Sequence, residues 1–255
     1  MTVGLDWLPN TAFVYLLLFS RIGSILMLMP ALGEDMIPMR MRLSFALAFT
    51  LVVYPLLSSS LPAMPADFMA IVGLIFHELA IGIMLGAIVR ITVMATQVAG
   101  AIIAFQAGLS AAMAADPTQV GVQGAVFGSF LSFLGMVLIF ATDLHHVALA
   151  ATYDSYTLFP LDAPLMFDDA AQLAIRTVAG AFSVGVQMAA PFIVFGLVFN
   201  LGAGILARLM PALQVFFLLM PANIMIGLVL FAMLLTMMMG WYLSHFEAHL
   251  AMWRG

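Results

Sequence analysis

The stretch Asp143-Leu-His-His146 holds the clearest candidates for chemistry in this 255-residue sequence. Asp143 and His146 are three positions apart, so they share one face of a helix. A carboxylate beside an imidazole can act as a proton relay or supply part of a metal site. A metal ion needs more ligands at fixed geometry, and the neighbouring sequence supplies none. The pattern favours a polar cluster of Asp143, His145 and His146 at a helix end, with a proton-sensitive element and a metal site as alternatives.

The remaining charges within apolar sequence are scattered at Arg21, Glu78 and Arg90. Glu78 and Arg90 would be about 18 Å apart along one helix, so they cannot pair with each other. Each of them needs another partner or water. Arg21 has apolar sequence on both sides, so we expect it to face a partner in the interior, with snorkelling to the interface as the alternative.

Motifs of common enzymes are absent from the sequence. It contains no phosphate-binding loop, no GxSxG and no HExxH, and it has no cysteine. An ion pump usually concentrates carboxylates within its spans, and no such concentration occurs here. We therefore expect no enzymatic activity, no cofactor and no metal.

The composition indicates an integral membrane protein or a subunit buried in an assembly that behaves like one. Hydrophobic residues make up 65% and charged residues only 7% of the chain, and the mean hydropathy is +1.19, whereas soluble domains carry about 25% charged residues. The formal net charge of −5 excludes a basic nucleic-acid footprint.

The hydropathy pattern predicts an all-α membrane protein with about six apolar segments. They cover residues 11–32, 42–57, 68–105, 125–151, 173–206 and 212–243. Three of them are longer than the roughly 20 residues that span a bilayer, so we expect broken and tilted helices or extensions into an assembly. Pro191 is expected to interrupt the fifth segment, and Asp67 to cap the third. Gly82 and Gly86 predict a close helix approach.

Residues 105–117 follow the longest apolar run and consist mainly of small residues ending in Asp-Pro. Irregular backbone near membrane depth persists only where it is buried in protein or lines a watery cavity. The stretch therefore predicts a plug or gate. The predicted plug residues are Phe105, Gln106, Gly108, Leu109, Ser110, Met113, Asp116 and Pro117, and Gly100 and Gly108 are candidate hinges because glycine accepts unusual backbone angles.

An ordered set of motifs spans nearly the whole chain. It consists of Phe19-Ser-Arg-Ile-Gly23, Pro30, Gly33, Ile37-Pro-Met-Arg40, Gly82-Ile-Met-Leu-Gly86, Arg90, Gly100, Gln106, Gly108-Leu-Ser110, Asp116-Pro117, Asp143-Leu-His-His146, Ala189-Ala-Pro191, Asn200, Ala207-Arg-Leu-Met-Pro211, Val215-Phe216 and Pro221. This set resembles the FliR family of flagellar biosynthetic proteins and its counterparts in virulence-associated type III secretion. The sequence departs from the family pattern at Leu144, which replaces Gly, and at Ala212, Gln214 and Asn223, which replace Gln, Asn and Lys.

The resemblance implies a subunit of the protein export gate at the flagellar basal body, in the bacterial inner membrane and partly protruding on the periplasmic side. FliP-like and FliQ-like subunits would complete a helical ring built from hairpins, and an FlhB-like switch protein would dock on its cytoplasmic side. Residues 1–172, with a plug loop at about 105–124, would be FliP-like, and residues 173–255 would form a FliQ-like hairpin. The candidate partner-packing residues are Arg21, Gly82, Gly86, Arg90, Arg208, Pro211, Val215 and Phe216.

Unfolded flagellar proteins would be transient partners, membrane lipid would be a permanent one, and nucleic acid would not be a partner. Three alternatives stay open. The equivalent subunit of an injectisome is one, and a scaffold without gating is another. A small-molecule or ion transporter would have to use Glu78, Arg90 and Asp143.

Overall fold

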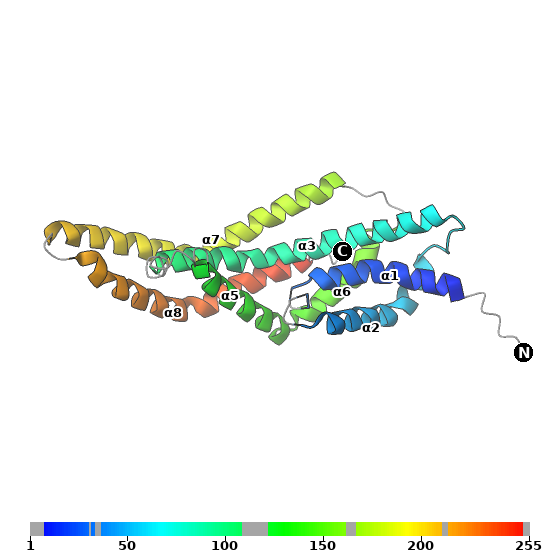
Figure 1. Ribbon diagram of the computed structural model, residues 1–255, viewed down its shortest axis with the longest axis horizontal. Helices are drawn as coiled ribbons and strands as arrows, with labels where there is room; N and C mark the ends of the chain where they lie inside the picture. Colours follow the sequence, from blue (N-terminus) through cyan, green and yellow to red (C-terminus); the bar gives the residue numbers. More distant parts are fainter. Residues whose placement is uncertain are drawn as a thin grey trace, which may run out of the picture. The chain divides into compact units, whose positions relative to one another are not determined.

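The computed structural model describes residues 8–30, 32–33, 37–108, 122–161, 167–210 and 214–251, and the regular structure of these residues is helical (Figure 1). The elements are α1 (Leu8–Leu28), α2 (Met39–Leu57), the 3₁₀ turn η1 (Ser58–Ser60), α3 (Phe68–Gln106), α5 (Val122–Ala141), α6 (Leu144–Leu158), α7 (Phe167–Leu209) and α8 (Val215–Ala251). Five helices among them are long and apolar enough to cross a membrane, or six if α5 and α6 form one broken span. The prediction of an all-α membrane protein is confirmed.

The predicted fourth segment, residues 125–151, is two helices rather than one. Helix α5 ends at Ala141 and α6 begins at Leu144. Between them Asp143 has a φ of 59°, a left-handed conformation that Asp tolerates better than most residues and that a right-handed helix cannot contain. Hydropathy missed the break because both sides of it are apolar.

Pro191 does not end a helix, contrary to the expectation from the sequence. Helix α7 runs for 43 residues with Pro191 inside it. Proline removes one backbone hydrogen bond and destabilises a helix interior. The neighbouring Met188, Ala189 and Phe192 are fully buried, so tertiary packing offsets that loss.

Contacts divide the chain into two compact units, and the first comprises Met1–Ile91, Thr142–Arg176 and Ala248–Gly255. Its core is the buried face of α1, where Leu17, Leu18 and Ile25 are fully inaccessible. Helix α2 lies beside α1 (Figure 1), and the hydroxyl of Tyr15 donates a hydrogen bond of 2.9 Å to the Leu47 carbonyl. The outer face of α2 is apolar and exposed. No other described part of this unit packs on it, and an apolar face of this kind is unfavourable in water.

Helices α1 and α3 approach closely at two glycines of α3. A Cβ atom at Gly82 would lie 2.6 Å from the Arg21 carbonyl oxygen and would overlap Ser24 Oγ, and one at Gly86 would lie 2.8 Å from Leu28 Cβ. The helix packed against this predicted patch is therefore α1 of the same chain.

We expect Gly82→Ala to destabilise the first unit by about 1–3 kcal/mol, because the added methyl group would force the α1 and α3 backbones apart. Gly73→Ala, in the same helix, is the matched control. A Cβ at Gly73 meets nothing within 4 Å, so this change should stabilise the helix by about 0.5–1 kcal/mol. Thermal unfolding of the purified variants measures both effects, and equal shifts would contradict the assigned contact.

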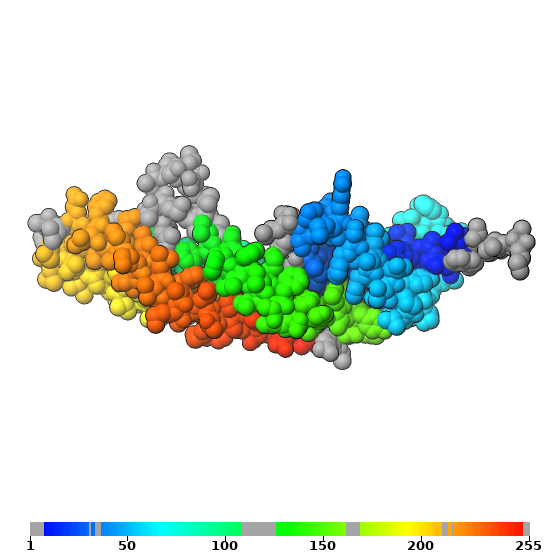
Figure 2. All heavy atoms as spheres, turned by 90° about the horizontal axis from the view of Figure 1, so that it is seen from below, coloured from blue at the N-terminus to red at the C-terminus, as the bar shows by residue number. Residues whose placement is uncertain are grey.

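The second unit, Thr92–Ala141 with Thr177–Glu247, is organised around the last turns of α3. Glycines permit close approach at each crossing: Gly100 meets the Gly128 backbone in α5, Gly185 of α7 meets Val98, and Gly227 of α8 meets Ala107. Helices α5 (green) and α8 (orange to red) lie side by side in Figure 2. Gly135 of α5 packs on the Tyr242 ring of α8.

Three aromatic rings complete the core of the second unit. The Phe231 ring lies edge-on to the Phe127 ring, with centroids 4.9 Å apart, and 6.3 Å from the Phe192 ring. Aromatic pairs at these separations add stability beyond their buried area. They hold α5, α7 and α8 together within this unit.

Candidate functional site

Arg21 is a fully buried charged side chain of the first unit. Its Nη2 atom lies 2.6 Å from Glu78 Oε1, and its Nη1 atom donates a hydrogen bond of 3.0 Å to the Ser155 carbonyl. The guanidinium carbon also lies 4.2 Å from the centroid of the Tyr156 ring, which is cation–π geometry. Arg21 of α1 thus joins α3 and α6 with one side chain.

Both members of this ion pair are fully buried. Tyr156 closes the arrangement by donating a hydrogen bond of 3.2 Å to the Leu18 carbonyl. From the sequence we predict that Arg21 and Glu78 each require a partner. The sequence does not show that the partner of each is the other, 57 positions away. The Glu78 carboxylate is paired with Arg21 and fully buried, so it links two helices and is not accessible to a transported solute.

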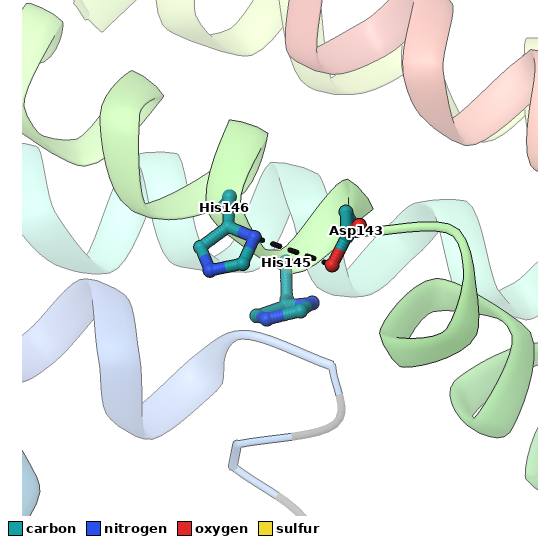
Figure 3. Close-up of side chains that lie close together, drawn as sticks. All are labelled: Asp143, His145 and His146. Atoms are coloured by element: carbon teal, nitrogen blue, oxygen red, sulfur yellow. Dashed lines mark ion pairs between the residues drawn. The ribbon is translucent and has the colours of Figure 1, made fainter.

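Asp143, His145 and His146 converge at the start of α6 (Figure 3), and their ligand atoms lie within 4.8 Å of one another. His146 Nδ1 is 3.5 Å from Asp143 Oδ1, but both side chains are more than two-thirds exposed. An exposed ion pair contributes about 0–1 kcal/mol, and the positive end of the helix dipole disfavours a cation at this position. The arrangement fits the predicted polar cluster at a helix end better than a metal centre.

The C-terminal end of α3, where the predicted plug begins, is fixed within the second unit. Gly108 has a φ of +74° and lies against the Asn223 side chain, whose Nδ2 atom is 3.5 Å from the Gln106 carbonyl oxygen. Ala107 is fully buried against Gly227 of α8. Residues 106–108 are therefore a packed helix end with a left-handed glycine cap.

Gly100 is enclosed near the C-terminal end of α3. A Cβ atom there would lie 2.7 Å from the Phe127 carbonyl carbon and closer still to Gly128. The structure therefore gives Gly100 a role in packing α3 against α5. Gly108 keeps the unusual backbone angle that the sequence analysis attributed to it.

The other predicted site residues are dispersed. Arg90 on α3, Phe105 near its end and Arg208 in the last turn of α7 are exposed, whereas Val215 is buried. The following predictions fall outside the described residues: Leu109, Ser110, Met113, Asp116 and Pro117 of the plug, and Pro211 and the Phe216 side chain among the packing positions.

Arg90 and Gln97 are polar residues that do not take part in the buried Arg21–Glu78 pair. Both are exposed on α3, whose sequence is mainly apolar. An arginine at the centre of a membrane helix costs about 2.5–3.5 kcal/mol when it faces lipid. The position of Arg90 on α3 is therefore unsuited to a lipid environment.

The fold and these sites define a helical membrane protein. Within the described residues, its buried charged side chains link one helix to another. Residues 12–249 match the family described as bacterial export proteins, family 1, and the chain belongs to that family. It is 44% identical over 224 residues to the flagellar biosynthetic protein FliR of Caulobacter vibrioides, covering 88% of this chain and 89% of that one.

More distant relatives cover similar lengths. The flagellar biosynthetic protein FliR of Escherichia coli is 28% identical over 235 residues, 91% of this chain and 87% of that protein. The Yop proteins translocation protein T of Yersinia pestis is 23% identical over 237 residues, 92% of this chain and 90% of that protein.

Proposed function

We propose that this protein is a core subunit of the flagellar type III export gate in the bacterial inner membrane, where it forms part of the channel wall and carries its internal plug. The observation that carries the proposal is the 44% identity to a flagellar FliR protein over 88% of the chain. Export of unfolded flagellar proteins through a gated conduit follows as the proposed activity.

The length of the apolar helices supports a place in a larger assembly. Helix α7 has 43 residues and would be about 64 Å long, roughly twice the 30 Å hydrocarbon core of a bilayer. It exposes large apolar side chains over about 47 Å of its length: Val178, Phe182, Val194, Leu197, Val198, Leu201, Ile205 and Leu209. A bilayer cannot cover all of this surface, so neighbouring proteins would have to cover the remainder.

The proposed neighbours are FliP-like and FliQ-like subunits, with an FlhB-like switch protein on the cytoplasmic side. Residues 1–172 would take the FliP-like place in the ring and residues 173–255 the FliQ-like place. The part of the helices that exceeds the bilayer would protrude on the periplasmic side. Helices with this much exposed apolar surface are suited to such lateral packing, because large exposed apolar patches mark protein or membrane contacts.

The proposed plug begins at Phe105 and ends at Pro117. The packed helix end at Gln106, Ala107 and Gly108 supplies a rigid attachment for such a plug. The small residues that follow in the sequence would allow it to fold compactly when closed. An apolar constriction can stop ions by excluding water. Energy for export would come from other components, so the gate itself would be passive.

Purification of a tagged chain from gently solubilised native membranes tests the proposal. The expected result is a large, stable particle that contains two further short, apolar, helical proteins in fixed ratio. A clean monomer or homodimer would contradict it and would favour a transporter, although the sealed Arg21–Glu78 pair already disfavours that alternative.

The injectisome alternative is supported by the similarity to the Yop translocation protein T. Loss of this protein in its native host would distinguish the two systems. Non-motile cells that lack filaments would support the flagellar proposal, and motile cells that fail to secrete other proteins would support the injectisome.

A further inference from the structure

Helix α2 matches a bilayer in length and leaves much of its surface uncovered. Its 19 residues would extend about 28 Å, close to the hydrocarbon thickness of roughly 30 Å. Large apolar side chains are exposed along it at Leu43, Leu47, Leu51, Val52 and Leu56. Two arginines lie in its first turn, and three serines follow its last turn. The apolar face therefore fits the acyl region of a bilayer, and the two polar ends fit the headgroup regions.

A cavity of about 180 Å³ lies beside the first turns of α2. Its lining is apolar apart from one arginine. The lining residues are Leu26, Leu32, Ile37, Met41, Arg42 and Phe45. The volume is smaller than the roughly 300–1,000 Å³ of a small-molecule site. The cavity therefore suits a short length of hydrocarbon that belongs to a larger molecule.

The protein satisfies the Arg42 guanidinium only in part. Its Nη1 atom donates a hydrogen bond of 2.9 Å to the Gly33 carbonyl, whereas its buried Nε atom has no hydrogen-bond partner among the described residues. Within the same part of the chain, no carboxylate pairs with Arg42 or with the exposed Arg40. A guanidinium binds phosphate through two donors at once. A cation at the edge of an apolar cavity is thus available to an anionic group.

Two acidic residues, Glu34 and Asp35, precede the arginines in the sequence and lie outside the described residues. Net charge alone therefore does not select an anion here, and the position of the arginines does. They begin a helix whose N-cap, Pro38, makes no side-chain hydrogen bond, and the first N–H groups and the dipole of a helix favour negative charge. By the positive-inside rule, to which acidic residues contribute little, this end faces the cytoplasm, where the leaflet carries anionic lipid.

We propose that the start of α2 is a binding site for an anionic phospholipid. Arg40 and Arg42 would hold the phosphate, and one acyl chain would enter the cavity beside Phe45 and continue along the exposed apolar face of α2. Basic pockets between membrane helices on the cytoplasmic side bind anionic headgroups. Such a site requires only a membrane location, so it would exist whether or not the protein acts in export.

Thermal unfolding of the purified full-length protein, together with any companions that remain bound to it, tests for the site. The probes are phosphatidylglycerol, phosphatidylethanolamine with the same acyl chains, and inorganic phosphate. A ligand that binds the folded state raises the unfolding temperature, so a titration gives its apparent affinity. Phosphatidylglycerol should bind at least about tenfold more tightly than phosphatidylethanolamine, and inorganic phosphate at the same concentration should produce no shift.

Each arginine near a membrane surface contributes about fivefold to the binding of anionic lipid. Arg40→Gln should therefore weaken phosphatidylglycerol binding about fivefold, and Arg40→Gln with Arg42→Gln about 25-fold, while phosphatidylethanolamine binding stays within about twofold. Because Arg42→Gln also removes the hydrogen bond to Gly33, the exposed Arg40→Gln decides the question if the double variant does not fold. Arg176→Gln removes an exposed arginine of α7 and is the matched control, which should bind both lipids as the unchanged protein does.

Three results would overturn the proposed lipid site. Equal affinity of the unchanged protein for the two lipids would show that it does not select an anionic headgroup. An equal loss in Arg40→Gln and Arg176→Gln would show that only overall charge matters. Stabilisation by inorganic phosphate as strong as that by phosphatidylglycerol would show that the start of α2 takes a free anion and that the apolar cavity holds no acyl chain.

Discussion

Replacing Arg21 by Met is expected to destabilise the first unit by about 3–5 kcal/mol, because the change leaves the Glu78 carboxylate buried without its counter-charge. The carboxylate is fully inaccessible and lies 2.6 Å from the guanidinium, so water cannot replace the lost partner. The replacement also removes the donor to the Ser155 carbonyl at the end of α6. Thermal unfolding of the purified assembly and the yield of assembled particle measure the loss.

A double-mutant cycle separates the ion pair from simple loss of volume. Glu78→Leu alone should also destabilise, since it leaves the guanidinium buried without its carboxylate. Arg21→Met with Glu78→Leu should cost less than the sum of the two single changes, by about 0.5–3 kcal/mol, because neither charge is then left alone. Arg176→Leu is the control: the side chain is exposed on α7 and the change should shift stability by less than about 0.5 kcal/mol. Additive single effects would show that the two charges do not interact.

The Arg21–Glu78 pair also shows what the sequence could and could not predict. Hydropathy located the helices, and a charge inside an apolar segment pointed to an interior partner. The identity of that partner depends on how α1 packs against α3, and local sequence does not contain that information. The only local sign of the packing was Gly82 with Gly86, and it correctly indicated that another helix comes close.

The break between α5 and α6 was missed for a related reason. One residue in a left-handed conformation, Asp143, ends a helix without any change in average hydropathy. A polar cluster at residues 143–146 was the available signal, and it was interpreted as lying at a helix end, but the segment 125–151 was still predicted as one piece. The opposite error occurred at Pro191, where a strong local signal for a break was overridden by the burial of Met188, Ala189 and Phe192. Tertiary packing decides both outcomes, and it is not visible in a window of sequence.

Replacing residues 109–115 by a Gly/Ser sequence of equal length is expected to make the closed gate leak ions. The replacement begins after Gly108 because Ala107 and Gly108 belong to the packed end of α3, and removing them would expose Gly227 and Asn223 in the core of the second unit. Equal length keeps the connection to α5 unstrained. The particle should therefore assemble normally, while its resting conductance in planar bilayers rises by more than about tenfold, which corresponds to a barrier lowered by about 1.4 kcal/mol or more.

Within the replaced stretch, Leu109 and Met113 are the two large apolar side chains, and they should supply most of the seal because apolar constrictions exclude ions by dewetting. Restoring only these two residues in the Gly/Ser background is expected to recover most of the barrier, whereas restoring Ser110 alone should not. Three outcomes are then distinct. A leak that Leu109 and Met113 repair supports a plug, an unchanged resting conductance rules out a plug at this position, and loss of the particle shows that the stretch is needed for assembly. The comparison is informative because the anchoring residues 106–108 are identical in every variant, so a difference in conductance reports on the seal and not on the end of α3.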